Sequence, residues 1–374
     1  MPEAALHDNF AALGVPQHDL APGVTTPLRF GDPREEHLAT RSACGLFDFS
    51  FMACAEIAGR ESRACIDYAQ TRRLDDLPLG RLAYTLLLRE DGTVLNDATV
   101  WQVEAGRYWL MTGRRSDLRH LQHIAEKFDV TFRDVSSQHA VLAVQGPRAS
   151  SLVGRCLNDI VPTLPPYYGF AKCRFDGVHC LIARVGYSGE SGYEIVVGTD
   201  RASALWQVLL EAGKDVGLRP CGFEAADALR IEAGHLLFSR ELALPVYPAE
   251  LGLSRLVDHY RGPFHGSGAL LAARRTLPRF CLVGLLPVAR GATDLATLQA
   301  VADISSHPTA IAAGTGLLTS AAFSPLYSRI LGLGYVSPAD RYPGTRVTLP
   351  GGVPAAVARR PFYDPAKALP RSAP

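Results

Sequence analysis

The segment from 81 to 113 constrains the fold more than any other, because it contains three apolar runs separated by turn signals. Its sequence, RLAYTLLLREDGTVLNDATVWQVEAGRYWLMTG, is interrupted by Asp-Gly at 91–92 and by Glu-Ala-Gly at 104–106. Such dipeptides and short glycine-containing turns join antiparallel strands. We therefore predict a meander of three strands here, with side chains that alternate between the two faces of a sheet.

A helix is expected directly after this meander, in RRSDLRHLQHIAEKF, where Ser116 or Asp117 can cap its start. Four apolar residues in it share one helical stripe: Leu118, Leu121, Ile124 and Phe128. Further strands are predicted at 140–147 and on both sides of the motif at 185–195, and helices in RASALWQVLLEAG and EAADALRIEAG. Sheet followed by helix indicates an α+β chain.

The C-terminal part has a different texture, because short apolar runs divided by glycine and proline begin at about residue 275. This pattern predicts a small all-β domain. The closing DPAKALPRSAP is rich in proline and is expected to be an untethered tail. A chain of 374 residues exceeds the roughly 250–300 at which a single core stops growing, so two or three domains are expected.

Composition excludes several classes of function. The formal net charge of +1 offers no attraction for nucleic acid or an anionic membrane. No basic and apolar leader begins the chain and no apolar run reaches 18 residues, so we expect a cytoplasmic protein without a membrane partner. The eight cysteines never form C-x-x-C and the histidines are scattered, which favours buried, reduced thiols and no metal site.

The motif VGYSGESGYEI at 185–195 combines three glycines with two carboxylates. The glycines allow positive φ and bring the backbone near a ligand, and Glu190 and Glu194 offer acceptors that suit a donor-rich heterocycle. From spacing alone, such a motif is more often a glycine-rich hairpin whose glutamates point to water. A serine nucleophile elbow is excluded because it requires G-x-S-x-G.

Several segments in the same order resemble the glycine-cleavage T-protein family, the aminomethyltransferases that transfer one-carbon units to tetrahydrofolate. GYSGESGYEI resembles the family signature GYTGEDGYEI. The match continues in PLRFGDPREEHLATRSACGLFDFSFM, LGRLAYTLLLREDGTVLNDATVW, AVLAVQGPRA, LRIEAG and AAFSPLYSRILGLGYV, and it covers residues 27 to 363. The chain is thus similar to this family, as a divergent member.

The resemblance implies an α+β fold of three domains around a folate-binding channel, with a small C-terminal β-barrel or jelly-roll-like domain. We assign the first, folate-binding domain to residues 1–50 and 138–255, and the second, α+β domain to 51–137. The third, all-β domain is expected at 275–365, followed by the tail at 366–374.

The resemblance also implies site residues. In the family the glutamate of Tyr-Glu-Ile grips the pterin ring, and it corresponds to Glu194. Tyr84 matches a tyrosine that lines the reaction centre, and Tyr187 is expected to contact the cofactor by stacking or packing. Tyr363 is expected to close the channel from the C-terminal domain. By the same reasoning Glu190 is expected to be a solvated loop carboxylate.

The chain departs from the family at three places. An adjacent pair of aspartates, the first of which is held to act at folate N10 and the transferring carbon, reads Asn96-Asp97. Asparagine cannot take a proton, and Asp97 would face the other side of a strand unless a bulge or register shift turned it inward. A folate-binding arginine falls on Ala226, and a Gly-Trp near the N-terminus becomes Gly23-Val24.

The function expected from these features is tetrahydrofolate-dependent transfer of a methyl or aminomethyl group from a small N-, O- or S-linked donor, which includes demethylation. Asn96 and Tyr84 would line the reaction centre, with Asp97 as a reserve acid or base. A lipoyl carrier protein is a further potential partner. Two alternatives stay open: a folate-binding accessory protein without catalysis, and an enzyme of this fold repurposed to a ligand other than folate.

Overall fold

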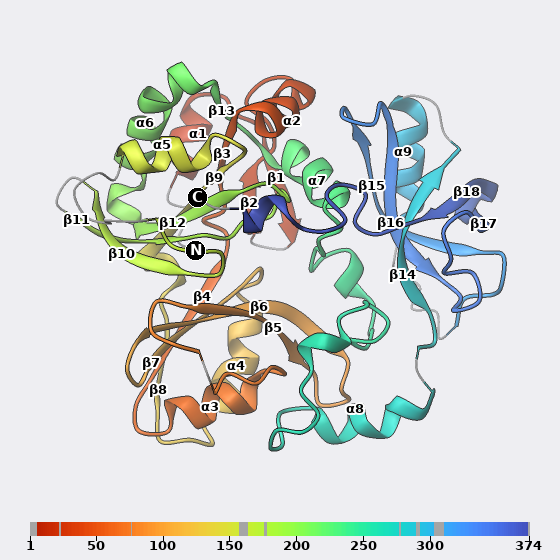
Figure 1. Cartoon of the computed structure of the whole chain (residues 1–374), viewed down its shortest axis with the longest axis horizontal. Helices are drawn as coiled ribbons and strands as arrows, with labels where there is room; N and C mark the ends of the chain where they lie inside the picture. The colour runs from red at the N-terminus through yellow and green to blue at the C-terminus, as the bar shows by residue number, and fades with distance from the viewer. Residues whose placement is uncertain are drawn as a thin grey trace.

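The computed structural model describes residues 6–21, 24–75, 77–156, 164–175, 178–276, 278–288, 292–302 and 310–372. Three larger sheets, each with its own helices, surround the centre of the molecule (Figure 1). The sheets are built from widely separated parts of the chain, so their facing edges and loops bring distant residues together.

A six-stranded sheet is assembled from both sides of the meander, with strand order β10-β11-β12-β9-β3-β13. Its strands are β3 (Cys44–Asp48), β9 (His139–Gln145), β10 (Phe170–Phe175), β11 (Val178–Ala183), β12 (Gly192–Gly198) and β13 (Leu218–Pro220). The helices around it are α1 (His7–Ala12), α2 (Pro33–Ser42), α5 (Ala149–Cys156), α6 (Ala202–Gly213) and α7 (Phe223–Glu232). A small hairpin, β1 (Gln17–Ala21) with β2 (Val24–Pro27), precedes α2.

Strand β9 shows why the central strands of this sheet are apolar throughout. Leu142 and Val144 pack in a core that includes Leu205 and Trp206 of α6. The alternate residues Val141 and Ala143 pack in a second core, which contains side chains of the neighbouring sheet. Because both faces are covered, the strand reads as a continuous hydrophobic run.

The predicted meander is confirmed as β5 (Leu82–Leu88), β6 (Val94–Glu104) and β7 (Arg107–Thr112). Strands β4 (Ala53–Ala58) and β8 (Thr131–Asp134) complete a five-stranded sheet that is covered by α3 (Ser62–Ala69) and α4 (Asp117–Ala125). Gly92 takes φ +80° in the β5–β6 turn. Ser116, one of the two expected caps, is the N-cap residue of α4, but its side chain makes no capping hydrogen bond.

The C-terminal sheet has strand order β15-β16-β14-β18-β17. An isolated bridge between Thr315 and Thr348 joins its two edges, so the strands close into a barrel. The strands are β14 (Cys281–Pro287), β15 (Gly316–Ser324), β16 (Arg329–Val336), β17 (Arg346–Leu349) and β18 (Val353–Ala358). The prediction that residues 275–365 are all β is wrong at one place, because α9 (Ala292–Val301) lies between β14 and β15. Helix α8 (Ser267–Ala273) precedes this part of the chain.

The segment after β18 does not behave as the free tail that its composition predicts. It leaves the barrel and returns to the six-stranded sheet, where the short helix η8 (Leu369–Arg371) lies near the label of the C-terminus (Figure 1). Arg184 donates a hydrogen bond to the carbonyl of Ser372, and the amide of Leu369 donates to Asp364 Oδ2 at 2.8 Å. These contacts fix the segment in place; residues 373 and 374 lie outside the described part. None of the described helices is long and apolar enough to cross a membrane.

Candidate active site

A cavity of about 1450 Å³ lies where the three sheets meet. Asp97 of β6, Glu194 of β12 and Val283 of β14 all line it, together with the segment from 234 to 238 and the C-terminal residues 365–367. Ligand sites commonly form at domain junctions. The cavity therefore is the candidate site, and it contains four of the six side chains that the sequence singled out: Tyr84, Asp97, Tyr187 and Glu194.

Tyr84 and Asp97 form a hydrogen-bonded pair on the wall made by β5 and β6. The Tyr84 hydroxyl donates to Asp97 Oδ2 at 2.8 Å. Burial raises the pKa of Asp97 to about 6, and the bond from Tyr84 opposes this by stabilising the charged form. A carboxyl group with such a pKa can both take and release a proton near neutral pH, as a general acid or base requires.

Asn96 does not line this cavity, which corrects its predicted place at the reaction centre. It is fully buried on the other face of β6, where Nδ2 donates to Thr112 Oγ1 at 2.9 Å and to Asp117 Oδ2 at 2.6 Å. The pairing of β5 with β6 shifts beyond Leu87, which pairs with Asn96, so the bulge that the sequence left open is present. Because neighbouring residues on a strand face opposite sides of the sheet, the same register places Asp97 in the cavity and Asn96 on the side of α4.

Glu194 presents its carboxylate to the cavity between two small neighbours. It pairs across the sheet with Ala143 of β9 and Ala183 of β11, which leave the space beside it open. Its side chain is 8% exposed, and burial raises its pKa to about 7. Among the described residues no side chain donates to this carboxylate, so its hydrogen-bonding capacity is available to a ligand.

The glycines of the motif between β11 and β12 have two different roles. Only Gly189 takes a positive φ, +83°. A side chain at Gly186 or Gly192 would overlap the amide of Gln145, on which the loop is packed. Ser188 Oγ donates to that amide oxygen at 2.9 Å, so the loop is fixed on β9. The expectation that all three glycines serve positive φ is thus too broad.

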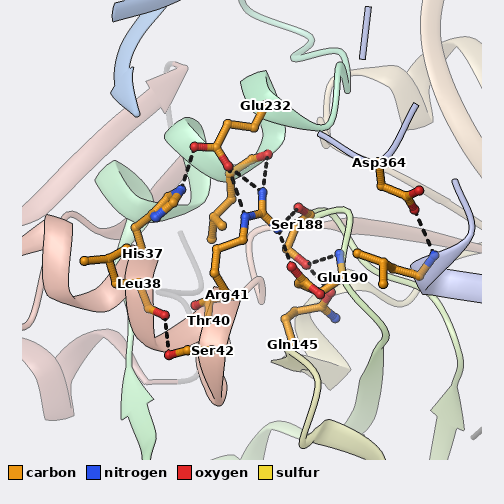
Figure 2. Close-up of polar contacts among 12 residues, drawn as sticks. His37, Leu38, Thr40, Arg41, Ser42, Gln145, Ser188, Glu190, Glu232 and Asp364 are labelled. Carbon is orange, nitrogen blue, oxygen red and sulfur yellow. Dashed lines mark hydrogen bonds and ion pairs between the residues drawn. The ribbon is translucent and has the colours of Figure 1, made fainter. Parts of the chain in front are cut away.

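Glu190 is not a solvated loop carboxylate, as predicted, but part of a buried charge network (Figure 2). Arg41 of α2 donates to Glu190 Oε1 at 2.8 Å, to the carbonyl of Ser188 at 3.0 Å and to Glu232 Oε2 at 2.7 Å. Glu232 also contacts His37 Nε2 at 2.8 Å. Despite its burial, the pKa of Glu232 is lowered, because His37 and Arg41 stabilise its charge.

Tyr363 lies beside this network and not in the large cavity. The Arg41 guanidinium is stacked 3.8 Å from the centroid of its ring, and Tyr363 lines an adjoining cavity of about 50 Å³. The two cavities share Tyr167, Tyr168 and His235 in their walls. Tyr363, which belongs to the C-terminal segment, thus lines the small adjoining cavity and not the large cavity that contains Asp97.

Two other charged residues of α7, Asp227 and Arg230, belong to a second ion-pair network. Arg230 contacts Asp227 and Glu241, each at 2.8 Å, and donates to Ser320 Oγ of β15 at 2.7 Å. Arg230 and Glu241 are fully buried. They join α7 to the barrel. Ala226, where the family has an arginine, is buried in an apolar core and does not line the cavity.

Sequence reasoning missed His235, a cavity residue with an evident chemical role. His235 is stacked on Tyr187, with ring centroids 5.7 Å apart and planes inclined by 19°. Burial, followed by Lys367 and Arg360, lowers the pKa of His235 to about 3, so the imidazole is neutral. The Tyr187 hydroxyl donates to the carbonyl of Leu236 at 2.5 Å, which fixes the stack. A lone histidine after a helix gives no signal in one sequence.

The site contains no cluster of histidine, cysteine or carboxylate side chains that could hold a metal, as far as the described residues go. Fold and site together define a class: a three-sheet α+β enzyme with buried acid–base and carboxylate groups in one interior cavity. Comparison with known proteins identifies that class more closely.

Residues 6–261 match the family model of the GCVT N-terminal domain, and residues 281–364 match the glycine cleavage T-protein C-terminal barrel domain. The chain belongs to this family. An aminomethyltransferase of Streptomyces coelicolor is 36% identical over 372 residues, 96% of each chain. One from Bacillus subtilis is 31% identical over 350 residues, 91% of this chain and 93% of its own.

The crystal structure of glycine cleavage system aminomethyltransferase T from Bartonella henselae has the same fold, with a TM-score of 0.80 and 26% identity. It covers 96% of this chain and 97% of its own. The predicted family, the α+β fold with a C-terminal barrel and the assignment as an enzyme for one-carbon groups are therefore confirmed.

Proposed function

We propose that this chain binds tetrahydrofolate in the central cavity and transfers a one-carbon group to it. A single observation carries the proposal: the unpartnered carboxylate of Glu194 and the Asp97–Tyr84 pair line the same cavity of about 1450 Å³. Membership of the T-protein family and the aminomethyltransferases of similar length support it.

The residues present fit a reduced pterin. Its amino and ring N–H groups are donors, and Glu194 is an acceptor without a protein partner; charge-assisted bonds of this kind contribute about 1.5–3 kcal/mol each. Tyr187, stacked on the neutral His235, provides an aromatic surface in the same wall. Glu194 would therefore orient the ring, and the Tyr187–His235 stack would bound it.

Tetrahydrofolate supplies the nitrogen that accepts the carbon. The role of the chain is to position that nitrogen beside Asp97 and to take up or release a proton. With a pKa of about 6, Asp97 is mostly ionised at pH 7, and the Tyr84 hydroxyl holds Oδ2, so Oδ1 is the oxygen that takes or returns the proton. Enclosure of both partners in one cavity would add to the rate enhancement through proximity and orientation.

The donor is the finer part of the proposal. The first candidate is an aminomethyl donor on a lipoyl carrier protein, on which Asp97 and Tyr84 would act; transfer of an aminomethyl group is what the relatives' name describes. A small methyl donor, the other donor expected from the sequence, is the second candidate. A purely folate-binding accessory role is less well supported, because it gives the Asp97–Tyr84 pair no function.

The test is calorimetric titration with tetrahydrofolate of the native chain, of Glu194→Ala and of a matched control, Glu224→Ala, which removes a partly exposed carboxylate outside the cavity. We expect Glu194→Ala to weaken binding by about 10- to 100-fold and the control to leave it unchanged. Absence of binding to the native chain would refute the proposal.

Catalysis is tested separately from binding. Asp97→Asn should retain tetrahydrofolate affinity and lower turnover by about 10²- to 10⁴-fold, measured with an aminomethyl-lipoyl carrier protein and, in parallel, with small methyl donors. The donor that the native chain uses and Asp97→Asn does not use identifies the reaction. Full activity of Asp97→Asn would remove Asp97 from the mechanism.

A further inference from the structure

The charges around the cavity are not balanced. Its wall contains many arginines and few carboxylates, and two of those carboxylates are already paired: Asp75 with Arg63 and Glu250 with Arg279. The other two, Asp97 and Glu194, owe their raised pKa values mainly to burial, and no cation is among the causes. Some of the positive charge in the wall therefore has no carboxylate partner among the residues that the structure describes.

Arg360 is the clearest case. It follows β18, and one of its nitrogens, Nη2, donates to the carbonyl of Leu251. The other, Nη1, is buried and has no hydrogen-bond partner among the described residues. Within the described part of the chain, no carboxylate lies within ion-pairing distance of this guanidinium. A buried N–H of a charged group that lacks a partner is costly, so the position is favourable for an anionic ligand.

Lys367 and Arg255 add two further cations to the same part of the cavity wall. Burial, followed by Arg360 and Arg255, lowers the pKa of Lys367 to about 8. Lys367 takes φ +51°, a left-handed conformation that is unusual outside glycine, and its amide donates to the carbonyl of Asp364 at 2.8 Å. The C-terminal segment is thus folded so that this lysine faces the cavity beside the arginines.

We propose that Arg255, Arg360 and Lys367 form a subsite that binds a ligand carboxylate, in addition to the groups that hold the pterin and move the proton. This inference rests on the proposed function for the rest of the ligand. Two sources carry the same chemistry: the glutamyl carboxylates of tetrahydrofolate, and the carboxylate of a small one-carbon donor such as an N-methyl amino acid. Either would pair with Arg360 Nη1 and reduce the repulsion among the three cations.

The experiment is calorimetric titration of the full chain and of Lys367→Gln, Arg255→Gln and Arg360→Gln. Arg346→Gln, on exposed β17, is the control for loss of one positive charge. Four ligands are compared: tetrahydrofolate; 6-methyltetrahydropterin, which has the ring without a carboxylate; N-methylglycine; and its uncharged amide. Thermal unfolding identifies variants that fail to fold, and Arg255 and Lys367, which are not fully buried, are the safest to change.

A roughly 10- to 100-fold loss of tetrahydrofolate affinity, with 6-methyltetrahydropterin unaffected, would assign the subsite to the glutamyl group. The same loss for N-methylglycine but not for its amide, with tetrahydrofolate unaffected, would assign it to the donor. If the subsite variants bind both carboxylate ligands as the Arg346→Gln control does, the subsite is overturned. If neither pterin binds but Lys367→Gln weakens binding of N-methylglycine, the proposed function fails and the subsite stands.

Discussion

Asn96→Asp restores the aspartate pair of the family, and the structure predicts that it destabilises the protein instead of activating it. The new carboxyl would lie where Asn96 Nδ2 is now, 2.6 Å from Asp117 Oδ2, and both positions are almost fully buried. Two carboxylates cannot both be ionised at that distance, although Arg114 lies 3.0 Å from Asp117. One of them must therefore hold a proton in the folded state.

The size of this destabilisation follows from the free energy needed to keep one carboxyl protonated. In the unfolded chain an aspartate has a pKa near 3.9, so holding it protonated at pH 7 costs about 4 kcal/mol, at 1.36 kcal/mol for each pH unit. The sign is that of a raised folded pKa: the cost is absent below about pH 4 and grows as pH rises towards the folded pKa. At pH 5 it is only about 1.5 kcal/mol.

The assay is thermal unfolding of Asn96→Asp and the native chain at pH 5 and pH 7. At roughly 2–4 °C per kcal/mol for a unit of 150–250 residues, the midpoint should fall by roughly 8–16 °C at pH 7 and by about 3–6 °C at pH 5. The matched control is Asn96→Asp with Asp117→Asn, which exchanges the two groups and should recover much of the loss. A variant with native stability at pH 7, or with a loss that does not depend on pH, would refute the reasoning.

Three other outcomes are expected. Tyr84→Phe removes a hydrogen bond that stabilises ionised Asp97, so the acidic limb of the pH profile of kcat/KM should move above about pH 6; a limb that stays or moves lower contradicts this. As the pH is raised towards about 7, where Glu194 ionises, tetrahydrofolate affinity should increase by up to tenfold per pH unit, and Glu194→Gln should abolish that dependence in titrations. Arg230→Met leaves Glu241 buried and unpaired, and should lower the free energy of unfolding by about 3–5 kcal/mol, whereas adding Glu241→Gln should recover part of it in urea denaturation.

The strands of the meander and those next to the motif at 185–195 were predictable because they depend on local patterns. The meander is marked by alternating residues and turn signals, and the family resemblance added the sheets' arrangement around a channel. The helix α9 was not predictable, since it falls in a region dominated by short apolar runs. The prediction of a free C-terminal tail was wrong for a different reason. The composition of the segment is that of a tail, but individual hydrogen bonds with Asp364 and Arg184 fix it, and composition does not reveal such contacts.

Residues that line the cavity were predictable where a family motif includes them. Glu194 and Tyr84 lie on strands and Tyr187 in the loop before β12, and all three line the cavity. Asn96 was predicted to line the reaction centre and Asp97 to be the reserve, whereas Asp97 lines the cavity and Asn96 does not. A register shift of one residue decides which neighbour faces inward, and no pattern in one sequence gives the register at a bulge. His235 and Arg360 were missed because each is isolated in sequence and becomes part of the site only through contacts between distant segments.

The network around Arg41 shows how these distant segments act on the site. Arg41 of α2 holds the loop before β12 through Ser188 and Glu190, and holds α7 through Glu232 (Figure 2). The backbone amide of Tyr363 donates to the carbonyl of Glu232 at 2.8 Å, so the C-terminal segment joins the same group. The loop that presents Tyr187 and the segment that presents Lys367 are therefore anchored to one buried arginine. Groups fixed in this way need little reorganisation when a ligand enters, which is the condition under which charge-assisted contacts contribute most to affinity.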